Sequence, residues 1–256
     1  MNSYTKFASL YDGLMNEDVN YDEWADYIEN LFDKYDRSPG IVCDLACGTG
    51  NMTLPLARRG YDMIGTDSAY AMLSQAQNKK YSENVDVLFL CQDMTELDLY
   101  GTISGAVCML DSLNHLDCAE DVAETIQKVG LFMEHNGIFI FDVNTIYKHR
   151  EILANNTFVY DCDDVYCVWQ NSLNKDDSVD ISLDIFEYED GAYYRSTEDF
   201  SERAYPIDNY KKWLADADFE ILHIYDEMSD RDFNNKTQRA VFVARYNGYK
   251  NKSEER

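Results

Sequence analysis

The amino-acid sequence predicts an α/β fold with a doubly wound, Rossmann-like parallel sheet. Short apolar runs alternate with helical patterns through the first 150 residues, as expected when each helix crosses over between parallel strands. The run Ile41–Leu45 leads through Gly48 and Gly50 into a helix start, a turn that suits nucleotide-like ligands. Four successive runs end in an acid, at Asp44, Asp67, Asp93 and Asp111. Because ligands bind at the carboxyl ends of parallel strands, these acids predict a ligand crevice at one edge of the sheet.

Composition limits the class of protein and its partners. The chain has 256 residues, 45% of them apolar, which suits one folded domain with a smaller insertion. Its net charge of −26 argues against nucleic acid and anionic membranes as partners, and favours solubility or cationic ligands. No apolar run approaches membrane-spanning length, and the first residues lack a signal-peptide core. The seven cysteines show no paired Cys-x-x-Cys spacing, so we expect no metal site and a cytoplasmic protein. The expected oligomeric state is a monomer or a homodimer.

Two aromatic and apolar stripes at helical spacing predict an N-terminal helical lid over residues 1–40. The core is expected over residues 41–150 and 206–246, and Cys43, Cys91 and Cys108 are expected to be buried in it. Hydrophobic period and helix-end signals predict its first elements as strand Ile41–Leu45, helix Leu54–Arg59, strands Tyr61–Asp67, Val85–Cys91 and Ile103–Leu110, a helix over 118–133, and strand Gly137–Asn144.

Residues 151–205 break this pattern. Four β-rich runs joined by turn residues predict a small antiparallel β subdomain, inserted beside the active-site edge of the main sheet. Its aromatic residues are expected to form its core, and the alternative is an aromatic site for a cationic or planar acceptor; they are Tyr160, Tyr166, Trp169, Tyr188, Tyr193 and Tyr194. After Pro206 we expect helix Ile207–Ala217 and strands Phe219–Tyr225 and Arg239–Arg245. A short connection requires the last strand of this seven-stranded sheet to run antiparallel.

Two residues of the glycine turn narrow the choice of ligand. A dinucleotide fingerprint has a third glycine where this chain has Thr53. Asp44 would repel a pyrophosphate but attract a ligand that carries an ammonium and a sulfonium, as S-adenosylmethionine (SAM) does. Asp67 lies at the distance beyond the turn where an acid binds ribose hydroxyls, and Asp67-Ser68 is also a good helix N-cap.

The segment Asp44-Leu45-Ala46-Cys47-Gly48-Thr49-Gly50 closely resembles the first motif of class I SAM-dependent methyltransferases, and Gln92-Asp93-Met94 is similar to their third motif. Two further segments, Tyr4–Met15 and Asp111–Leu116, resemble a bacterial small-molecule subgroup of the YqeM-like, methyltransferase-25 type. The resemblance runs from Tyr4 to about Arg245. It implies a methyltransferase sheet that uses SAM and releases S-adenosylhomocysteine (SAH).

The resemblance also implies roles for individual residues. Cofactor contacts are expected from Tyr4, Phe7, Tyr11, Asp44, Ala46, Cys47, Gly48, Gly50, Asp67, Ser68, Met72, Asp93, Met94, Leu110 and Asp111. Acceptor contacts are expected from Asn114, His115, Tyr160, Trp169, Arg203 and Tyr205. His115 or Asp111 is the candidate general base, and the alternative for His115 is packing at a helix start. Related sequences tend to have a histidine within the stretch that matches residues 198–205, where this chain has none.

We therefore expect a SAM-dependent methyltransferase that transfers a methyl group in line to an unidentified, small-molecule acceptor. Catalysis would consist mainly of holding the acceptor lone pair in line with the methyl group. Two alternatives are a nicotinamide-dependent oxidoreductase, which Asp44 and Thr53 disfavour, and a SAM-binding module without turnover.

Overall fold

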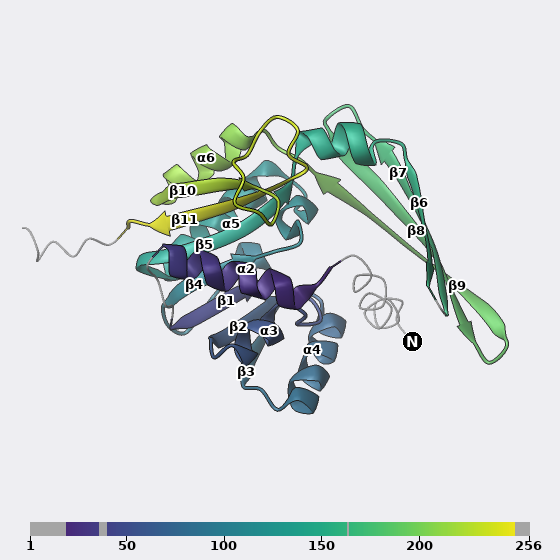
Figure 1. Ribbon diagram of the computed structural model, residues 1–256, viewed down its shortest axis with the longest axis horizontal. Coiled ribbons are helices and arrows are strands. Elements are labelled where there is room, and N and C mark those ends of the chain that lie inside the picture. The colour runs from purple at the N-terminus through teal and green to yellow at the C-terminus, as the bar shows by residue number, and fades with distance from the viewer. Residues whose placement is uncertain (1–18, 36–39, 163, 249–256) are drawn as a thin grey trace, which may run out of the picture.

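The computed structural model describes residues 19–35, 40–162 and 164–248, and the statements below concern this part of the chain. It contains a seven-stranded sheet and a separate four-stranded sheet, which projects from one side of the larger body (Figure 1). The expected lid aromatics Tyr4, Phe7 and Tyr11 lie outside the described residues, so their role stays a prediction.

The large sheet comprises β1 (Ile41–Leu45), β2 (Asp62–Asp67), β3 (Val87–Cys91), β4 (Ile103–Cys108), β5 (Met133–Asn144), β10 (Phe219–Asp226) and β11 (Arg239–Tyr246). Their order across the sheet is β10-β11-β5-β4-β1-β2-β3. Neighbours pair in parallel, except that β11 runs antiparallel to both β10 and β5. The predicted doubly wound sheet with an antiparallel last strand is thus confirmed.

Helices cover both faces of this sheet. On one face, α2 (Tyr21–Lys34) and α3 (Thr53–Arg58) share an apolar cluster with β1, β2 and β11. On the other face, α5 (Ala119–Phe132) and α6 (Ile207–Asp216) pack on a second cluster that includes β4 and β5. The helix α4 (Tyr70–Glu83) packs against β2 and β3 at one edge. Burial on both faces explains why the central strands are nearly continuous apolar runs.

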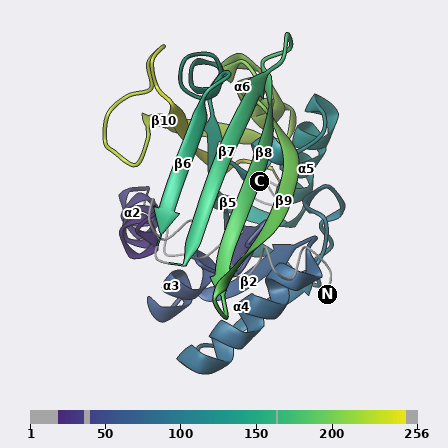
Figure 2. The ribbon, with the colours of Figure 1, turned by 90° about the vertical axis from the view of Figure 1, so that its right-hand side faces the viewer.

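The four-stranded sheet is antiparallel and comprises β6 (Thr157–Cys162), β7 (Val165–Leu173), β8 (Ser178–Glu189) and β9 (Ala192–Arg203) in that order. Figure 2 shows its broad face in front of the main body. The predicted insertion is confirmed, but only some of its aromatic residues pack in its core. Tyr160 and Trp169 pack on the inner cluster, whereas the other four are exposed, namely Tyr166, Tyr188, Tyr193 and Tyr194. Strand alternation turns Tyr166 away from that cluster, and the last three lie near the hairpin tip.

Three short helices follow strands of the main sheet and shape its carboxyl edge. They are η1 (Met94–Glu96), η2 (Ser112–His115) and the π-helical turn η3 (Lys148–Leu153). Turns of the π type are often found at functional sites. The expected burial of Cys91 is wrong, because β3 is an edge strand and its last residue is exposed. Within the described ranges, no helix is both long and apolar enough to cross a bilayer.

Candidate active site

The turn after β1 depends on backbone conformations that favour glycine. Gly48 and Gly50 have φ angles of +55° and +79°, and Ala46 between the strand and the turn has +52°. The amide of Cys47 donates to the carbonyl of Thr66 at 2.9 Å, which ties the turn to β2. A Cβ atom on Gly48 would meet nothing within 4 Å, so this part of the turn borders open space.

Asp44 is a buried carboxyl at the centre of the sheet. Its side chain accepts a hydrogen bond from Thr53 Oγ1 at 2.5 Å, and the residue is only 2% exposed. Burial raises the pKa of Asp44 to about 7; the Thr53 bond opposes this rise and the charge of Asp67 adds to it. In the described part of the chain, no lysine or arginine forms an ion pair with Asp44. An ammonium group of a ligand would supply the missing positive charge, so this site fits the methionyl end of SAM.

Asp67 joins the glycine turn to the end of β2. Its Oδ2 accepts from the amide of Gly48 at 2.8 Å, and its Oδ1 accepts from the amide of Ala69 at 2.8 Å. A carboxylate oxygen has two acceptor sites, so each oxygen keeps one for a ribose hydroxyl. Burial raises the pKa of Asp67, and the two backbone bonds limit that rise. The two expected roles, backbone capping and ribose binding, are therefore compatible in this geometry.

A cavity of about 290 Å³ opens beside Asp67. Six of the predicted site residues line it, namely Ala46, Asp67, Ser68, Asp93, Met94 and His115. Asp93 caps η1, because its Oδ1 accepts from the amide and the hydroxyl of Thr95 at 2.9 and 2.7 Å. Met72 is half-buried in the first turn of α4 and lies outside this lining. The lining combines the carboxylates of Asp67 and Asp93 with the apolar side chain of Met94, which suits an adenosine.

The chain after β4 is held in an unusual conformation. Leu110 and Asp111 both have positive φ angles, +59° and +51°, which are strained for residues other than glycine. The buried carboxylate of Asp142 compensates, since it accepts from the amides of Leu110 and Asp111 at 2.6 and 2.9 Å. Arg239, a half-buried residue at the start of β11, forms ion pairs with Asp142 and, at 2.7 Å, with Asp111.

This arrangement decides the charge state of Asp111. Burial alone would raise the pKa of Asp111, but the positive charges of Arg239 and Lys148 hold it at about 2. A carboxylate with so low a pKa is a poor proton acceptor at neutral pH. The structure therefore favours a charge-pairing role for Asp111, and leaves His115 as the better of the two predicted bases.

A second cavity, of about 420 Å³, lies between the carboxyl edge of the main sheet and the inner face of the inserted sheet. The predicted residues Leu110, Asp111, His115, Tyr160 and Trp169 all line it. His115 lines both cavities, so they meet at this side chain. Its imidazole packs against the ring of Phe200 at 5.3 Å, with Nε2 4.0 Å from Asp111 Oδ2.

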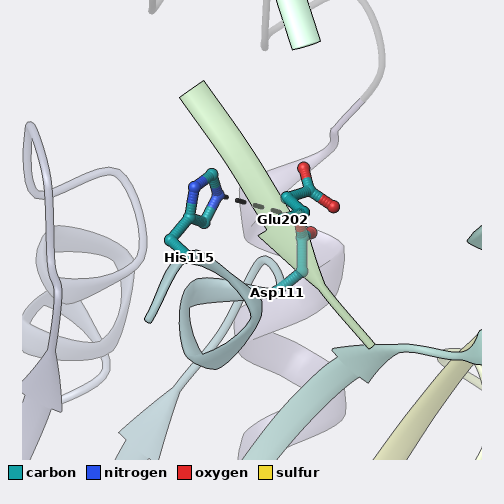
Figure 3. A group of neighbouring side chains, drawn as sticks. All are labelled: Asp111, His115 and Glu202. Atoms are coloured by element: carbon teal, nitrogen blue, oxygen red, sulfur yellow. Dashed lines mark ion pairs between the residues drawn. The ribbon is translucent and has the colours of Figure 1, made fainter. Parts of the chain in front are cut away.

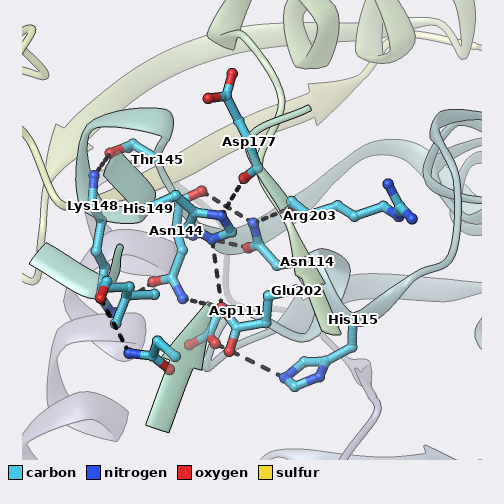
Figure 4. Close-up of polar contacts among 12 residues, drawn as sticks. Asp111, Asn114, His115, Asn144, Thr145, Lys148, His149, Asp177, Glu202 and Arg203 are labelled. Atoms are coloured by element: carbon cyan, nitrogen blue, oxygen red, sulfur yellow. Dashed lines mark hydrogen bonds and ion pairs between the residues drawn. The ribbon is translucent and has the colours of Figure 1, made fainter. Parts of the chain in front are cut away.

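Three residues of this cavity and its wall were not predicted. Glu202 reaches in from β9, Lys148 lines the cavity from η3, and His149 lies buried behind Glu202 (Figure 4). The carboxylate of Glu202 accepts from Asn144 Nδ2 at 2.9 Å, and Lys148 Nζ donates to Asn144 Oδ1 at 2.8 Å. Strand alternation could have placed Glu202 on the inner face, since every second residue of β9 points inward. No local signal marks Lys148 or His149.

Three expected acceptor contacts lie elsewhere. Asn114 is fully buried and ties β5 to β9, since its Nδ2 donates to the carbonyls of Asn144 and Arg203 while its Oδ1 accepts from the amide of Asn144. The guanidinium of Arg203 pairs with Asp176 at 2.9 Å, and Tyr205 packs edge-on against Trp213. These residues position the insert, and none of the three lines the 420 Å³ cavity.

Asp111, His115 and Glu202, which all line the second cavity, lie close together (Figure 3). One potential ligand atom of each lies within 4.8 Å of the others, which is a possible metal-ligand set. Arg239 already neutralises Asp111, so the group is also suited to binding and deprotonating a substrate. The expectation that the protein uses no metal stays a prediction.

The strand order, the glycine turn and the acidic edge together define a class I SAM-dependent methyltransferase. Residues 42–137 match the family described as "Methyltransferase domain". The "Putative methyltransferase YqeM" of Bacillus subtilis is 34% identical over 244 residues, 94% of this chain and 96% of that protein. A SAM-dependent methyltransferase structure from Clostridium acetobutylicum is 32% identical, with a TM-score of 0.88 over 96% of this chain and all of that one.

The chain therefore belongs to the SAM-dependent methyltransferase family, in the group that contains YqeM. The SAM-bound structure of CalS10, an amino pentose methyltransferase from Micromonospora echinaspora, has a TM-score of 0.77 at 15% identity, covering 92% of this chain and 96% of that one. At that identity it shows the shared fold alone. Membership of this family disfavours the nicotinamide-dependent oxidoreductase as an alternative.

Proposed function

We propose that the chain binds SAM along the carboxyl edge of the main sheet and transfers its methyl group in line to a small molecule in the 420 Å³ cavity. The observation that carries this proposal is the junction of the two cavities at His115. One cavity suits an adenosine, the other is closed on one side by the insert, and Asp44 is buried near the end of β1, just before the glycine turn.

The roles of the residues follow from their positions. Asp67 would hold the ribose, Asp93 and Met94 the adenine, and Asp44 the methionyl ammonium. When bound, SAM supplies a methyl group that is already electrophilic because it is attached to a sulfonium. The chain's own task is to orient an acceptor and exclude water, and the insert does both by covering the edge of the sheet. We propose a small-molecule acceptor and no nucleic acid or membrane partner, in keeping with the net charge of −26.

Two measurements on the wild-type protein test this proposal. Isothermal calorimetry should show binding of SAH and no comparable binding of NAD. Incubation with methyl-labelled SAM and fractionated bacterial small molecules should move the label into an acceptor fraction. Failure to bind SAH would refute the cofactor assignment. Binding of SAH without transfer to any fraction would instead favour a SAM-binding module.

A further inference from the structure

We propose that the methyl acceptor is an amine, and that Glu202, supported by His149, is the carboxylate that binds it and accepts its proton. This inference rests on the proposed function, because it concerns the acceptor side of the same site. It concerns Glu202, which lies in the group with Asp111 and His115, and His149 behind it.

Glu202 is a buried acid without a direct ion pair to a lysine or arginine, and its nearest cation, Lys148, reaches it only through the amide of Asn144. The residue is 2% exposed, and in the described part of the chain its side chain accepts a hydrogen bond only from the neutral amide of Asn144. Over residues 19–35, 40–162 and 164–248, no lysine or arginine forms an ion pair with Glu202. Burying an unpaired carboxylate is costly, so a site that retains one is suited to a cationic ligand group.

The imidazole of His149 faces Glu202 with an atom that needs a proton. Its Nδ1 lies 2.7 Å from the carbonyl oxygen of Asp177, which can only accept, so Nδ1 carries a hydrogen. In the neutral ring, Nε2 then has a lone pair, and it lies 3.6 Å from Glu202 Oε2 with no hydrogen-bond partner of its own. Two lone pairs facing each other in a buried site repel, and a single proton between them removes that repulsion. The His149–Glu202 pair is therefore built to accept one proton.

The acids near the His149–Glu202 pair already have a cationic partner, which leaves this pair as the proton acceptor. Asp111 and Asp142 are both ion-paired with Arg239. Lys148 lines the same cavity and donates to Asn144, whose amide in turn donates to Glu202. His115 stands at the open side, where 44% of its side chain is exposed. A hydroxyl or thiol acceptor would bring no charge to Glu202, whereas an ammonium would pair with it directly.

The walls of the cavity suit the same ligand. They are lined by the aromatic side chains of Trp24, Phe158, Tyr160, Trp169 and Phe200. Aromatic faces attract cations as well as apolar groups, and Trp does so most strongly. The cavity thus fits an amine whose charged end meets Glu202 and whose apolar body lies against the rings.

The reaction balances as follows. The amine enters as an ammonium and gives one proton to the His149–Glu202 pair. The freed nitrogen lone pair forms the new N–C bond to the methyl group, while the C–S bond breaks and its electron pair stays on sulfur as SAH. The proton held by the pair then leaves to solvent on the side where His115 is exposed.

The identity of the labelled acceptor tests the chemical class. A bacterial small-molecule extract is separated into cationic, neutral and anionic fractions on ion exchangers, and each is incubated with wild-type protein and methyl-labelled SAM. We expect label in the cationic fraction, in a product whose fragmentation spectrum contains an N-methyl group. Label in the neutral or anionic fraction, or in none, overturns the amine assignment. Calorimetry with SAH on the same protein decides separately whether the proposed cofactor site stands.

Variants then test the two residues, with the labelled amine as substrate. Glu202→Gln keeps the size of the side chain and can donate to His149, so it should fold and bind SAH as the wild type does. We expect its kcat/KM to fall about 100-fold or more, the usual effect of removing a proton acceptor. Asp199→Asn, an exposed change on the opposite face of β9, is the matched control and should leave kcat/KM unchanged. A fall of less than threefold in Glu202→Gln, which is about the scatter of such measurements, refutes the role of Glu202.

His149 acts through Glu202 and is a positioning residue. His149→Gln should lower kcat/KM and change the shape of its pH dependence, because the pair no longer shares a proton. A variant that merely loosens the fold would lower kcat/KM by the same factor at every pH. That uniform loss, together with a lowered melting temperature, would refute the role of His149.

Discussion

A substitution at Asp44 tests the electrostatics of the site, because removing this buried charge should raise the stability of the ligand-free fold and weaken the binding of SAH. The pKa of its buried carboxyl is raised from 3.8 to about 7. Because the pKa of Asp44 is higher in the folded protein than in the unfolded chain, this residue costs the fold no stability below about pH 4. The cost grows as the pH rises from about 4 to 7, where the carboxyl loses its proton, and it is complete above pH 7. At about 1.4 kcal/mol per pKa unit, the penalty at pH 8 is on the order of 4 kcal/mol.

The substitution Asp44→Asn removes that charge but keeps an oxygen for the Thr53 hydroxyl. The new amide hydrogens have no designed acceptor, which costs about 1–3 kcal/mol. The net gain of about 1–3 kcal/mol should raise the melting temperature of the ligand-free protein at pH 8 by about 3–10 °C. Binding should respond in the opposite direction, because the ammonium of SAH loses its charged partner, and we expect affinity to fall about 10- to 100-fold.

Calorimetry with SAH between pH 5.5 and 8 and thermal unfolding at each pH provide the readouts. Wild-type affinity should fall up to about tenfold per unit as the pH drops below 7, since Asp44 then takes a proton. The Asp44→Asn variant should lack this dependence, and Asp199→Asn should behave as the wild type. Equal SAH affinity in Asp44→Asn and wild type, or a lower melting temperature in the variant at pH 8, would refute the reasoning.

Two further predictions concern neighbouring groups. Asp67→Ala should weaken SAH binding about 100-fold in calorimetry, because two charge-assisted bonds to hydroxyls are lost; unchanged affinity would remove the ribose assignment. Arg239→Met should lower the free energy of unfolding by about 3–5 kcal/mol in urea titrations, since it leaves two buried carboxylates unpaired. Arg239→Lys keeps the charge and should lose clearly less, and an equal loss in both variants would contradict the electrostatic cause.

The main sheet could be predicted because its signals are local. Apolar runs, helix ends and the short connection before β11 each act over a few residues, and together they specify the strand directions. The glycine turn and its acid also lie within one segment, so the cofactor class was accessible from Asp44 and Thr53. The structure adds a second role for Thr53. In the sequence this residue matters because it replaces the third glycine of a dinucleotide fingerprint, and in the fold its hydroxyl donates a hydrogen bond to Asp44.

The acceptor side could not be predicted to the same degree, because its contacts join distant segments. The family resemblance predicted acceptor contacts from Asn114 and Arg203. In the fold, both ends of the Asn114 amide bond to backbone groups, and the guanidinium of Arg203 bonds to Asp176. Glu202 meets His149 only because β9, the last strand of the insert, returns to the carboxyl edge of the main sheet. No motif in the sequence around either residue predicts this contact.

The sequence by itself therefore determined the sheet, the turn and the acids that line the cofactor edge, since these depend on local periodicity and on chain direction. Only the tertiary structure decided which of the acids keep an unpaired charge. Asp111 is neutralised by Arg239, which lies 128 residues away in the chain, whereas Glu202 is not. The energy of a buried charge depends on its neighbours in space, and no pattern along the chain records them.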